Sequence, residues 1–196
     1  DKALREKLKP DYVIGCKRVL LSNNYLPALK KPNVKLIADP IECITPGGIR
    51  TGDGSEHPLD IIIASTGFLA AEAGSPFPVY GLENRELNEQ WQGGASAYLG
   101  TTVNGFPNFF IMTGPNTALG HNSMIYMIES QASYVMSALT LIKKSPDTAF
   151  DIPEQTQNHY NEALQKRLAK TVWNTGGCSS WYLASNGLNT TLWPDF

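Results

Sequence analysis

The chain has 196 residues, of which 42% are hydrophobic and 17% are charged, and its formal net charge is −2. This composition is typical of a globular protein with a buried core and excludes a disordered chain. The nearly balanced charge gives no reason to expect nucleic acid or an anionic membrane as a partner, and no apolar run approaches the ~20 residues that span a bilayer.

The first third of the chain predicts short elements. Residues 2–9 alternate charge and leucine, which indicates a surface helix that Pro10 ends. Pro46-Gly47-Gly48 is typical of a turn between two strands. The continuous apolar run at residues 59–64 predicts a strand covered on both faces. In all, strands are expected at residues 33–38, 41–45, 49–51 and 59–64.

The remaining two thirds predict loops, one further strand and two long helices. Residues 70–105 are rich in Gly, Pro, Ser and Asn and read as loop. A second buried strand is expected at residues 108–113. The first long helix begins after Asn122 or Ser123, either of which can cap it, and ends at Lys143-Lys144. The second helix is expected at residues 153–173.

Two of the predicted strands end in glycine turns, Ser65-Thr66-Gly67 and Gly114-Pro115-Asn116. Ligands bind beyond the carboxyl ends of strands in open α/β sheets, and a glycine there lets the backbone approach a flat cofactor. The helix that follows the second turn directs free N–H groups back towards it. The pattern fits a flavin site, and it equally fits two ordinary turns.

No G-x-G-x-x-G and no P-loop occurs in the chain, so the sequence does not support a self-sufficient dinucleotide site. Lys17 and Arg18 are adjacent cations that point in different directions. One can bind a phosphate and the other an oxyanion, or both can be solvated at the surface.

Cysteines and histidines suggest no metal site. Cys16, Cys43 and Cys178 are far apart and odd in number, which predicts neither a zinc site nor a disulfide framework and favours a reducing, cytoplasmic compartment. His121 can either donate to a cofactor or cap the helix, and no histidine pair has metal-ligand spacing. Trp181 lies in an aromatic C-terminal segment and either packs the domain or flanks a cofactor.

Several motifs, taken in order, resemble Baeyer–Villiger-type flavin-containing monooxygenases over nearly the whole chain. They begin with residues 11–18, which end in Gly15-Cys16-Lys17-Arg18, and continue through the run that ends in Ser65-Thr66-Gly67-Phe68, where the family usually has Ala for Ser65. The other matching segments are Gly105-Phe106-Pro107-Asn108, Gly114-Pro115-Asn116, Gly120-His121-Asn122-Ser123, Glu129-Ser130-Gln131, Ser180-Trp181-Tyr182 and Leu192-Trp193-Pro194.

The resemblance implies roles for individual residues and two cofactors, FAD and NADPH. Arg18 is similar to the arginine that stabilises the anionic peroxyflavin and the Criegee intermediate, and is the implied catalytic residue. Lys17 is similar to the lysine that binds the 2′-phosphate of NADPH. Met124 lies in a stretch that lines the substrate pocket. The remaining implied cofactor-binding residues are Thr66, Gly67, Gly114, Asn116, His121, Asn122, Ser123 and Trp181.

The implied fold is α/β: the C-terminal portion of a Rossmann-like, three-layer FAD/NAD(P)-binding fold, with a small antiparallel β element and two long helices. Residues 1–66 would be the end of the NADPH-binding domain and residues 67–196 the C-terminal portion of the FAD-binding domain. The family's N-terminal G-x-G-x-x-G and its F-x-G-x-x-x-H-x-x-x-W fingerprint are absent. We therefore expect a fragment whose partner is the missing N-terminal part and which alone binds FAD weakly or not at all.

Three functions follow as hypotheses. The first is oxygenation of a small ketone by O₂ to an ester or lactone in the full-length enzyme, the fragment itself being inactive. The second is N- or S-oxygenation, in which Arg18 would matter less. The third is a free-standing, non-catalytic module that self-associates through exposed apolar surface.

Overall fold

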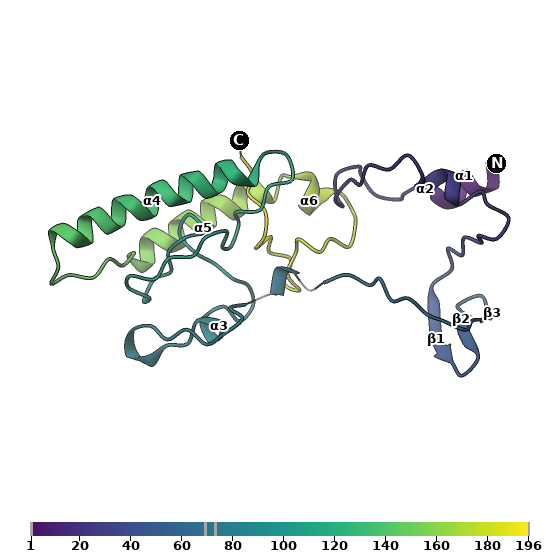
Figure 1. Ribbon diagram of the computed structural model, residues 1–196, viewed down its shortest axis with the longest axis horizontal. Coiled ribbons are helices and arrows are strands. Elements are labelled where there is room, and N and C mark those ends of the chain that lie inside the picture. Colours follow the sequence, from purple (N-terminus) through teal and green to yellow (C-terminus); the bar gives the residue numbers. More distant parts are fainter. Residues whose placement is uncertain (1, 69, 73, 196) are drawn as a thin grey trace. The chain divides into compact units, whose positions relative to one another are not determined.

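The computed structural model describes residues 2–68, 70–72 and 74–195 (Figure 1). The chain divides into two compact units. Unit 1 comprises Asp1–Pro10 and Val19–Gly67, and unit 2 comprises Asp11–Arg18 and Phe68–Phe196. The segment Asp11–Arg18 therefore belongs to unit 2, although the sequence on both sides of it belongs to unit 1.

Unit 1 contains a three-stranded antiparallel sheet in the order β1-β2-β3. Its helices and strands are α1 (Lys2–Leu8), α2 (Tyr25–Ala28), β1 (Ile41–Thr45), β2 (Gly48–Thr51) and β3 (Glu56–Pro58). Thr45 pairs with Gly48 across the predicted Pro46-Gly47 turn, and Arg50 Nε lies 2.6 Å from Glu56 Oε1. The predicted helix and the predicted hairpin are confirmed.

The strands predicted at residues 33–38, 59–64 and 108–113 are wrong for this chain, because none of them is a strand in the structure. Residues 59–64 lie outside any ladder, and their side chains are exposed, with Ile61 at 77% and Ile63 at 86%. A central strand needs a hydrogen-bonded neighbour on each edge. Apart from Leu59, whose N donates to Gly47 O over 3.1 Å, the described residues give this run no such neighbour.

Unit 2 is built around two long helices, α4 (Met124–Lys144) and α5 (Glu154–Leu168). Ser123 caps α4 in extended conformation, as predicted. The predicted helix 153–173 is interrupted: α5 ends at Leu168, Thr171 is extended, and the short α6 (Val172–Thr175) follows. Thr171 Oγ1 donates to Leu168 O over 2.7 Å, which caps the break. The remaining elements are η1 (Ala70–Glu72), η2 (Leu82–Asn84) and α3 (Leu87–Gln90).

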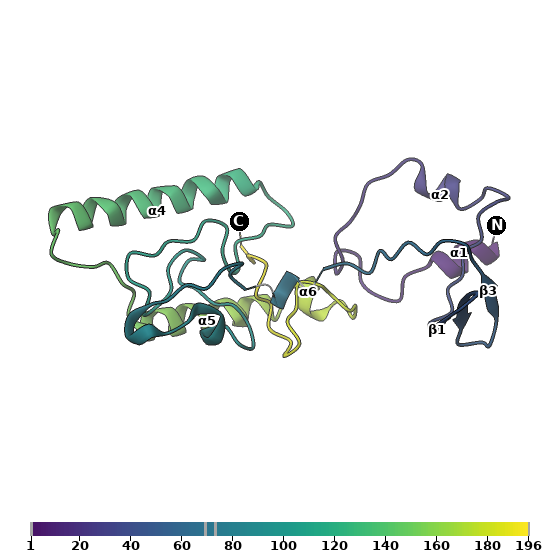
Figure 2. The ribbon, with the colours of Figure 1, turned by 60° about the horizontal axis from the view of Figure 1, so that its bottom comes forward.

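A loop-rich layer lies between α4 and α5 in unit 2 (Figure 2). Asn104 N donates to Gln157 Oε1 of α5 over 2.7 Å, and Thr102 Oγ1 lies 3.3 Å from Tyr134 Oη of α4. Two buried clusters fill this unit. One contains Leu87, Ala97, Val103 and Phe106, and the other Leu164, Leu168, Tyr182 and Leu192.

Within residues 2–68, 70–72 and 74–195, no helix has both the length and the apolar character that crossing a membrane requires.

Candidate functional site

In unit 2, residues 113–119 form a wall shared by two cavities. The first cavity has a volume of about 560 Å³ and a mainly apolar lining that includes Trp91, Phe109, Met112, Gly114 and Met124. The second has about 250 Å³, and its lining includes Asn116, Asn122, Gln131, Tyr134 and Trp193. The structure thus brings the predicted residues Gly114 and Met124 to the first cavity. It brings Asn116 and Asn122 to the second.

The turn at Thr113-Gly114 is held in place by Gln131 of α4. Gln131 is 3% exposed; its Oε1 accepts from Thr113 N over 2.9 Å, and its Nε2 donates to Gly100 O over 3.1 Å. Thr113 has φ = 56°, a region that β-branched residues rarely adopt. A Cβ on Gly114 would lie 2.4 Å from Gly100 O, so only glycine fits there. The surrounding structure therefore fixes this backbone in a strained conformation, as is common at functional sites.

Asn116 anchors the same wall to the C-terminal segment. Its side chain is buried, and Nδ2 donates to Asn189 O over 2.6 Å and to Leu192 O over 3.0 Å. Asn189 is itself fully buried, and its Oδ1 accepts from Leu192 N over 3.0 Å. Since both Nδ2 protons of Asn116 bind backbone carbonyls, this amide shapes the wall from within.

The predicted residues before α4 form local contacts. His121 Nε2 donates to Asp195 O over 2.8 Å, and its ring stacks 6.0 Å from the ring of Trp173. Asn122 Oδ1 accepts from Ser123 N over 2.7 Å. Ser123 is the N-cap, yet its side chain makes no capping hydrogen bond. The start of α4 is therefore organised by Asn122 and by the contact of His121 with the C-terminal segment.

Lys17 and Arg18 lie in the segment Asp11–Arg18, and both are exposed. The Nζ atom of Lys17 sits 4.9 Å from the centroid of the Tyr12 ring. Within the described residues neither Lys17 nor Arg18 forms an ion pair, whereas Arg50 and Arg167 each bind a carboxylate. The two predicted cations are therefore uncompensated, and neither lines the two cavities.

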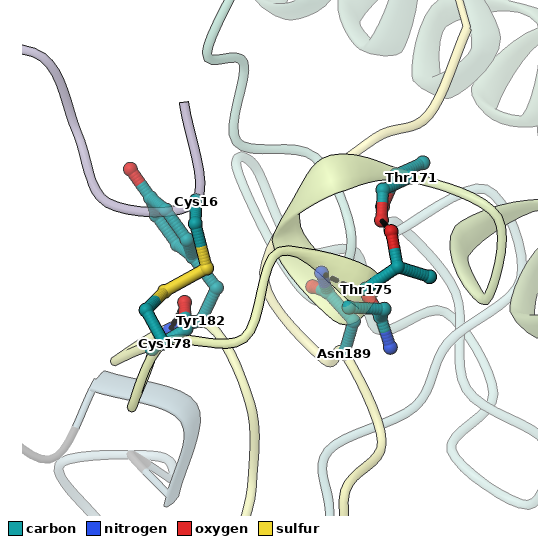
Figure 3. The surroundings of a disulfide bond; sticks show 8 residues. Cys16, Thr171, Thr175, Cys178, Tyr182 and Asn189 are labelled. Atoms are coloured by element: carbon teal, nitrogen blue, oxygen red, sulfur yellow. Dashed lines mark hydrogen bonds between the residues drawn. A yellow bond between two sulfur atoms is a disulfide. The ribbon is translucent and has the colours of Figure 1, made fainter. Parts of the chain in front are cut away.

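The prediction that the cysteines form no disulfide is wrong. Cys16 and Cys178 are joined, with their Cα atoms 6.2 Å apart and 162 residues apart in sequence, while Cys43 is free and exposed (Figure 3). Spacing along the chain could not reveal this pair, because folding brings the two ends of unit 2 together. The expectation of a reducing compartment rested on unpaired cysteines and loses that support.

Like Lys17 and Arg18, three further predicted residues line neither cavity. Trp181 is 43% exposed, and its ring lies 5.4 Å from that of Tyr182. Thr66 and Gly67 are exposed at the end of unit 1. Gln131, Asn189 and Cys178 are residues that the sequence reasoning missed. Only Gln131 carried a signal, as a polar residue between Met127 and Ala138 on the apolar face of a predicted helix.

The comparisons with known proteins agree along the whole chain, although no protein-family model matches it. A Baeyer–Villiger monooxygenase of Pseudomonas aeruginosa is 49% identical over 200 residues, covering 100% of this chain and 37% of the relative. One of Streptomyces coelicolor is 46% identical, covering 99% of this chain and 38% of the relative. The chain thus spans little more than a third of the length of the curated relatives it matches.

Solved structures match as well. OTEMO in complex with FAD and NADP has a TM-score of 0.82 at 30% identity, covering 100% of this chain and 37% of that one. An oxidized steroid monooxygenase bound to NADP has a TM-score of 0.79 at 29% identity, covering 98% and 37%. These matches put the chain among the flavin monooxygenases. Within that class it belongs to the Baeyer–Villiger type, of which it represents a C-terminal portion.

Proposed function

We propose that this chain is part of an FAD- and NADPH-dependent monooxygenase that inserts one oxygen atom from O₂ next to a ketone carbonyl, giving an ester or lactone. The 49% identity to a Baeyer–Villiger monooxygenase over the whole chain carries this proposal. Bound FAD, reduced by NADPH, would supply the activation of O₂. The chain's own residues would bind, orient and stabilise charge.

The first cavity suits the flat ring of a flavin. Its apolar lining and its volume of about 560 Å³ are typical of cofactor sites. Met124 is both the first residue of α4 and part of the lining. The helix therefore presents free N–H groups and the positive end of its dipole near this cavity, where they favour negative charge.

The diphosphate of FAD has no comparable cradle here, because the sequence contains no G-x-G-x-x-G. We therefore assign to this chain only the end of FAD that carries the flavin ring. Met124 would contact the ketone. The residues that would contact the cofactors are those predicted from the sequence: Thr66, Gly67, Gly114, Asn116, His121, Asn122, Ser123 and Trp181. The missing N-terminal part would bind the diphosphate.

Lys17 and Arg18 would meet anions of two kinds. A guanidinium without a carboxylate partner can hold its full charge against a developing oxyanion, so Arg18 would stabilise negative charge at the reacting centre. Lys17 would bind the 2′-phosphate of NADPH as a mobile point charge. This division gives Arg18 the catalytic role and Lys17 a role in cofactor choice.

Exposed apolar residues support a missing partner. Ile61, Ile63, Ile125, Met136 and Leu141 are each more than half exposed, and exposed apolar residues in such number are typical of a surface that a partner covers. We propose that the N-terminal part of the same protein covers them and completes a Rossmann-like, three-layer fold. Residues 1–66 would end the NADPH domain, residues 67–196 would close the FAD domain, and the whole would be cytoplasmic. The chain alone would self-associate through the uncovered surface.

The test is a titration with FAD, followed by flavin fluorescence and visible absorbance. We expect weak or no binding to the 196-residue chain and stoichiometric binding once the N-terminal part is present. Tight binding to the chain alone would contradict the division of the cofactor between the two parts. For the reaction, the reconstituted protein is given NADPH, O₂ and a small cyclic ketone. A lactone supports the proposal, while oxidation only of amine or sulfide probes supports N- or S-oxygenation instead.

A further inference from the structure

The Cys16–Cys178 disulfide holds in unit 2 a segment whose neighbours in sequence belong to unit 1. Residues on both sides of Asp11–Arg18 belong to unit 1, so both ends of this segment lead out of the unit in which it packs. Lys17 and Arg18 follow Cys16 directly. Whatever fixes Cys16 therefore also fixes the backbone that carries both cations.

The contacts of this segment converge on the stretch from Val172 to Cys178. Val13 N donates to Gly176 O over 2.9 Å. Gly176 packs so closely that a Cβ there would lie 2.9 Å from Cys16 Sγ. Figure 3 shows the bridge between the segment and the chain after α6, with Tyr182 beside it. Apart from these contacts the segment is open, since Ile14 is 80% exposed and Val13 56%.

We propose that the Cys16–Cys178 disulfide is a redox-controlled clamp that positions Lys17 and Arg18 on unit 2. The bond closes a loop of 162 residues in sequence, which restricts the segment far more than one backbone hydrogen bond does. Opening the bond leaves the segment attached only by weak contacts near Gly176, and both cations lose their fixed place. What the cations bind rests on the function proposed above.

A small dithiol can reduce the Cys16–Cys178 disulfide, and it supplies the electrons and protons that the reaction needs. Cys16 is fully buried and Cys178 is only partly buried, so a dithiol thiolate attacks the sulfur of Cys178. The S–S bond breaks, Cys16 leaves as a thiolate and takes a proton, and a mixed disulfide forms on Cys178. The second thiol of the reductant then releases Cys178 as a thiol and closes a cyclic disulfide. Two electrons and two protons pass from the dithiol to the two cysteines, and a low-molecular disulfide reverses the change.

The first test is limited trypsin digestion of the intact protein that contains this chain, with and without dithiothreitol, read by mass spectrometry. Trypsin cleaves after Lys17 and Arg18. We expect reduction to raise cleavage there roughly tenfold, because cleavage follows local opening, while cleavage after the exposed Lys30 stays the same. Cys178→Ser should behave as the reduced protein does, and Cys43→Ser is the matched control. Three reactive thiols before reduction, or equal cleavage in both states, would overturn the clamp.

The second test separates the clamp from the proposed function. A lost Lys17–phosphate contact should raise KM for NADPH roughly tenfold in the reduced protein and leave KM for NADH unchanged, an effect that general destabilisation does not produce. Increased cleavage without this selective change refutes the role of Lys17 and keeps the clamp. A selective change in KM without increased cleavage refutes the clamp and keeps the role of Lys17. The dithiothreitol experiment needs no variant, so it decides even if Cys178→Ser fails to fold.

Discussion

Gln131 binds the backbone of Thr113, a β-branched residue held at φ = 56°, with Oε1 accepting from N over 2.9 Å. Its Nε2 also donates to Thr101 Oγ1 over 2.8 Å. Gln131→Met keeps the volume but removes the acceptor of Thr113 N and the donor to Gly100 O, and leaves Thr101 Oγ1 with only its bond to Leu99 O. We expect it to lower the free energy of unfolding by about 2–4 kcal/mol, measured by urea denaturation.

The neighbouring Ser130 provides the control for that variant. Its hydroxyl donates only to Tyr126 O of its own helix and is exposed, so Ser130→Ala should change stability by no more than about 0.5 kcal/mol. Gln131→Glu tests the donor alone, because a carboxylate still accepts from Thr113 N but cannot donate to Gly100 O. Equal stability of Gln131→Met and Ser130→Ala would show that the Thr113-Gly114 turn does not depend on the hydrogen bonds of Gln131.

Asn116 combines a backbone strain with two side-chain hydrogen bonds, and two substitutions separate them. Its φ is 56°, and Nδ2 binds two carbonyls. Asn116→Gly and Asn116→Ala both lose these hydrogen bonds. In addition, alanine must adopt the left-handed backbone conformation, which costs about 1–2 kcal/mol of folding free energy. We therefore expect alanine to be the less stable of the two by that amount in thermal unfolding.

Asn108 is the matched site for this comparison. Its φ is 60°, it is exposed, and its Oδ1 accepts one bond, from Phe150 N over 2.9 Å. Asn108→Ala should be less stable than Asn108→Gly by the same amount, and each variant should lose less stability than its counterpart at Asn116. If Asn116→Gly were as stable as the parent protein, the two buried hydrogen bonds would contribute nothing to the wall.

The local elements could be predicted from sequence because local residues decide them. Ser123 and Lys143-Lys144 bound α4 in sequence and in structure, and the Pro46-Gly47-Gly48 turn joins β1 to β2. The prediction of a strand at residues 59–64 is wrong, because an apolar run becomes a strand only beside neighbouring strands, which the described part of the chain does not provide. The Cys16–Cys178 bond and the Asn116–Asn189 contact depend on residues far apart in sequence. No periodicity or local propensity encodes such contacts.

Asp53 stabilises the turn between β2 and β3 in its charged form. Thr51 Oγ1 donates to its carboxylate over 2.7 Å and Ser55 N over 3.0 Å, and these hydrogen bonds, that of Thr51 foremost, lower the pKa of Asp53 to about 2. Since the folded pKa lies below its ordinary value of 3.8, the contribution is complete above about pH 4 and is lost as pH falls through 2.

An NMR titration of the Asp53 carboxyl carbon measures this effect directly. Thr51→Val removes the largest cause and should raise the pKa towards 3.8. Ser55→Ala removes a hydroxyl bond of 2.9 Å but keeps the backbone donor, so its shift should be smaller. A larger shift in Ser55→Ala than in Thr51→Val would reverse the assigned order of causes.

Tyr160 buries a hydroxyl that has no hydrogen-bond partner among the described residues. Its ring meets that of Tyr98 edge-on at 5.2 Å, and burial raises the pKa of Tyr160 to about 12. Tyr160→Phe removes only the unpaired group, so we expect a protein as stable as the parent or more stable by about 1 kcal/mol. Tyr134 is the matched control: its hydroxyl lies 3.3 Å from Thr102 Oγ1, so Tyr134→Phe should lose about 0.5–1.5 kcal/mol.

The dependence of stability on pH in alkaline solution gives a second measurement of the effect of Tyr160. Because burial holds the folded pKa above the ordinary value of 10, the phenol ionises more readily in the unfolded protein. The pH therefore does not change stability through this group below pH 10, and stability falls as pH rises from 10 to about 12. Urea midpoints measured from about pH 9 to about pH 12 should fall less steeply with pH for Tyr160→Phe than for Tyr134→Phe. If Tyr160→Phe were instead the less stable variant at neutral pH, the hydroxyl of Tyr160 would have to bind a partner outside the described residues.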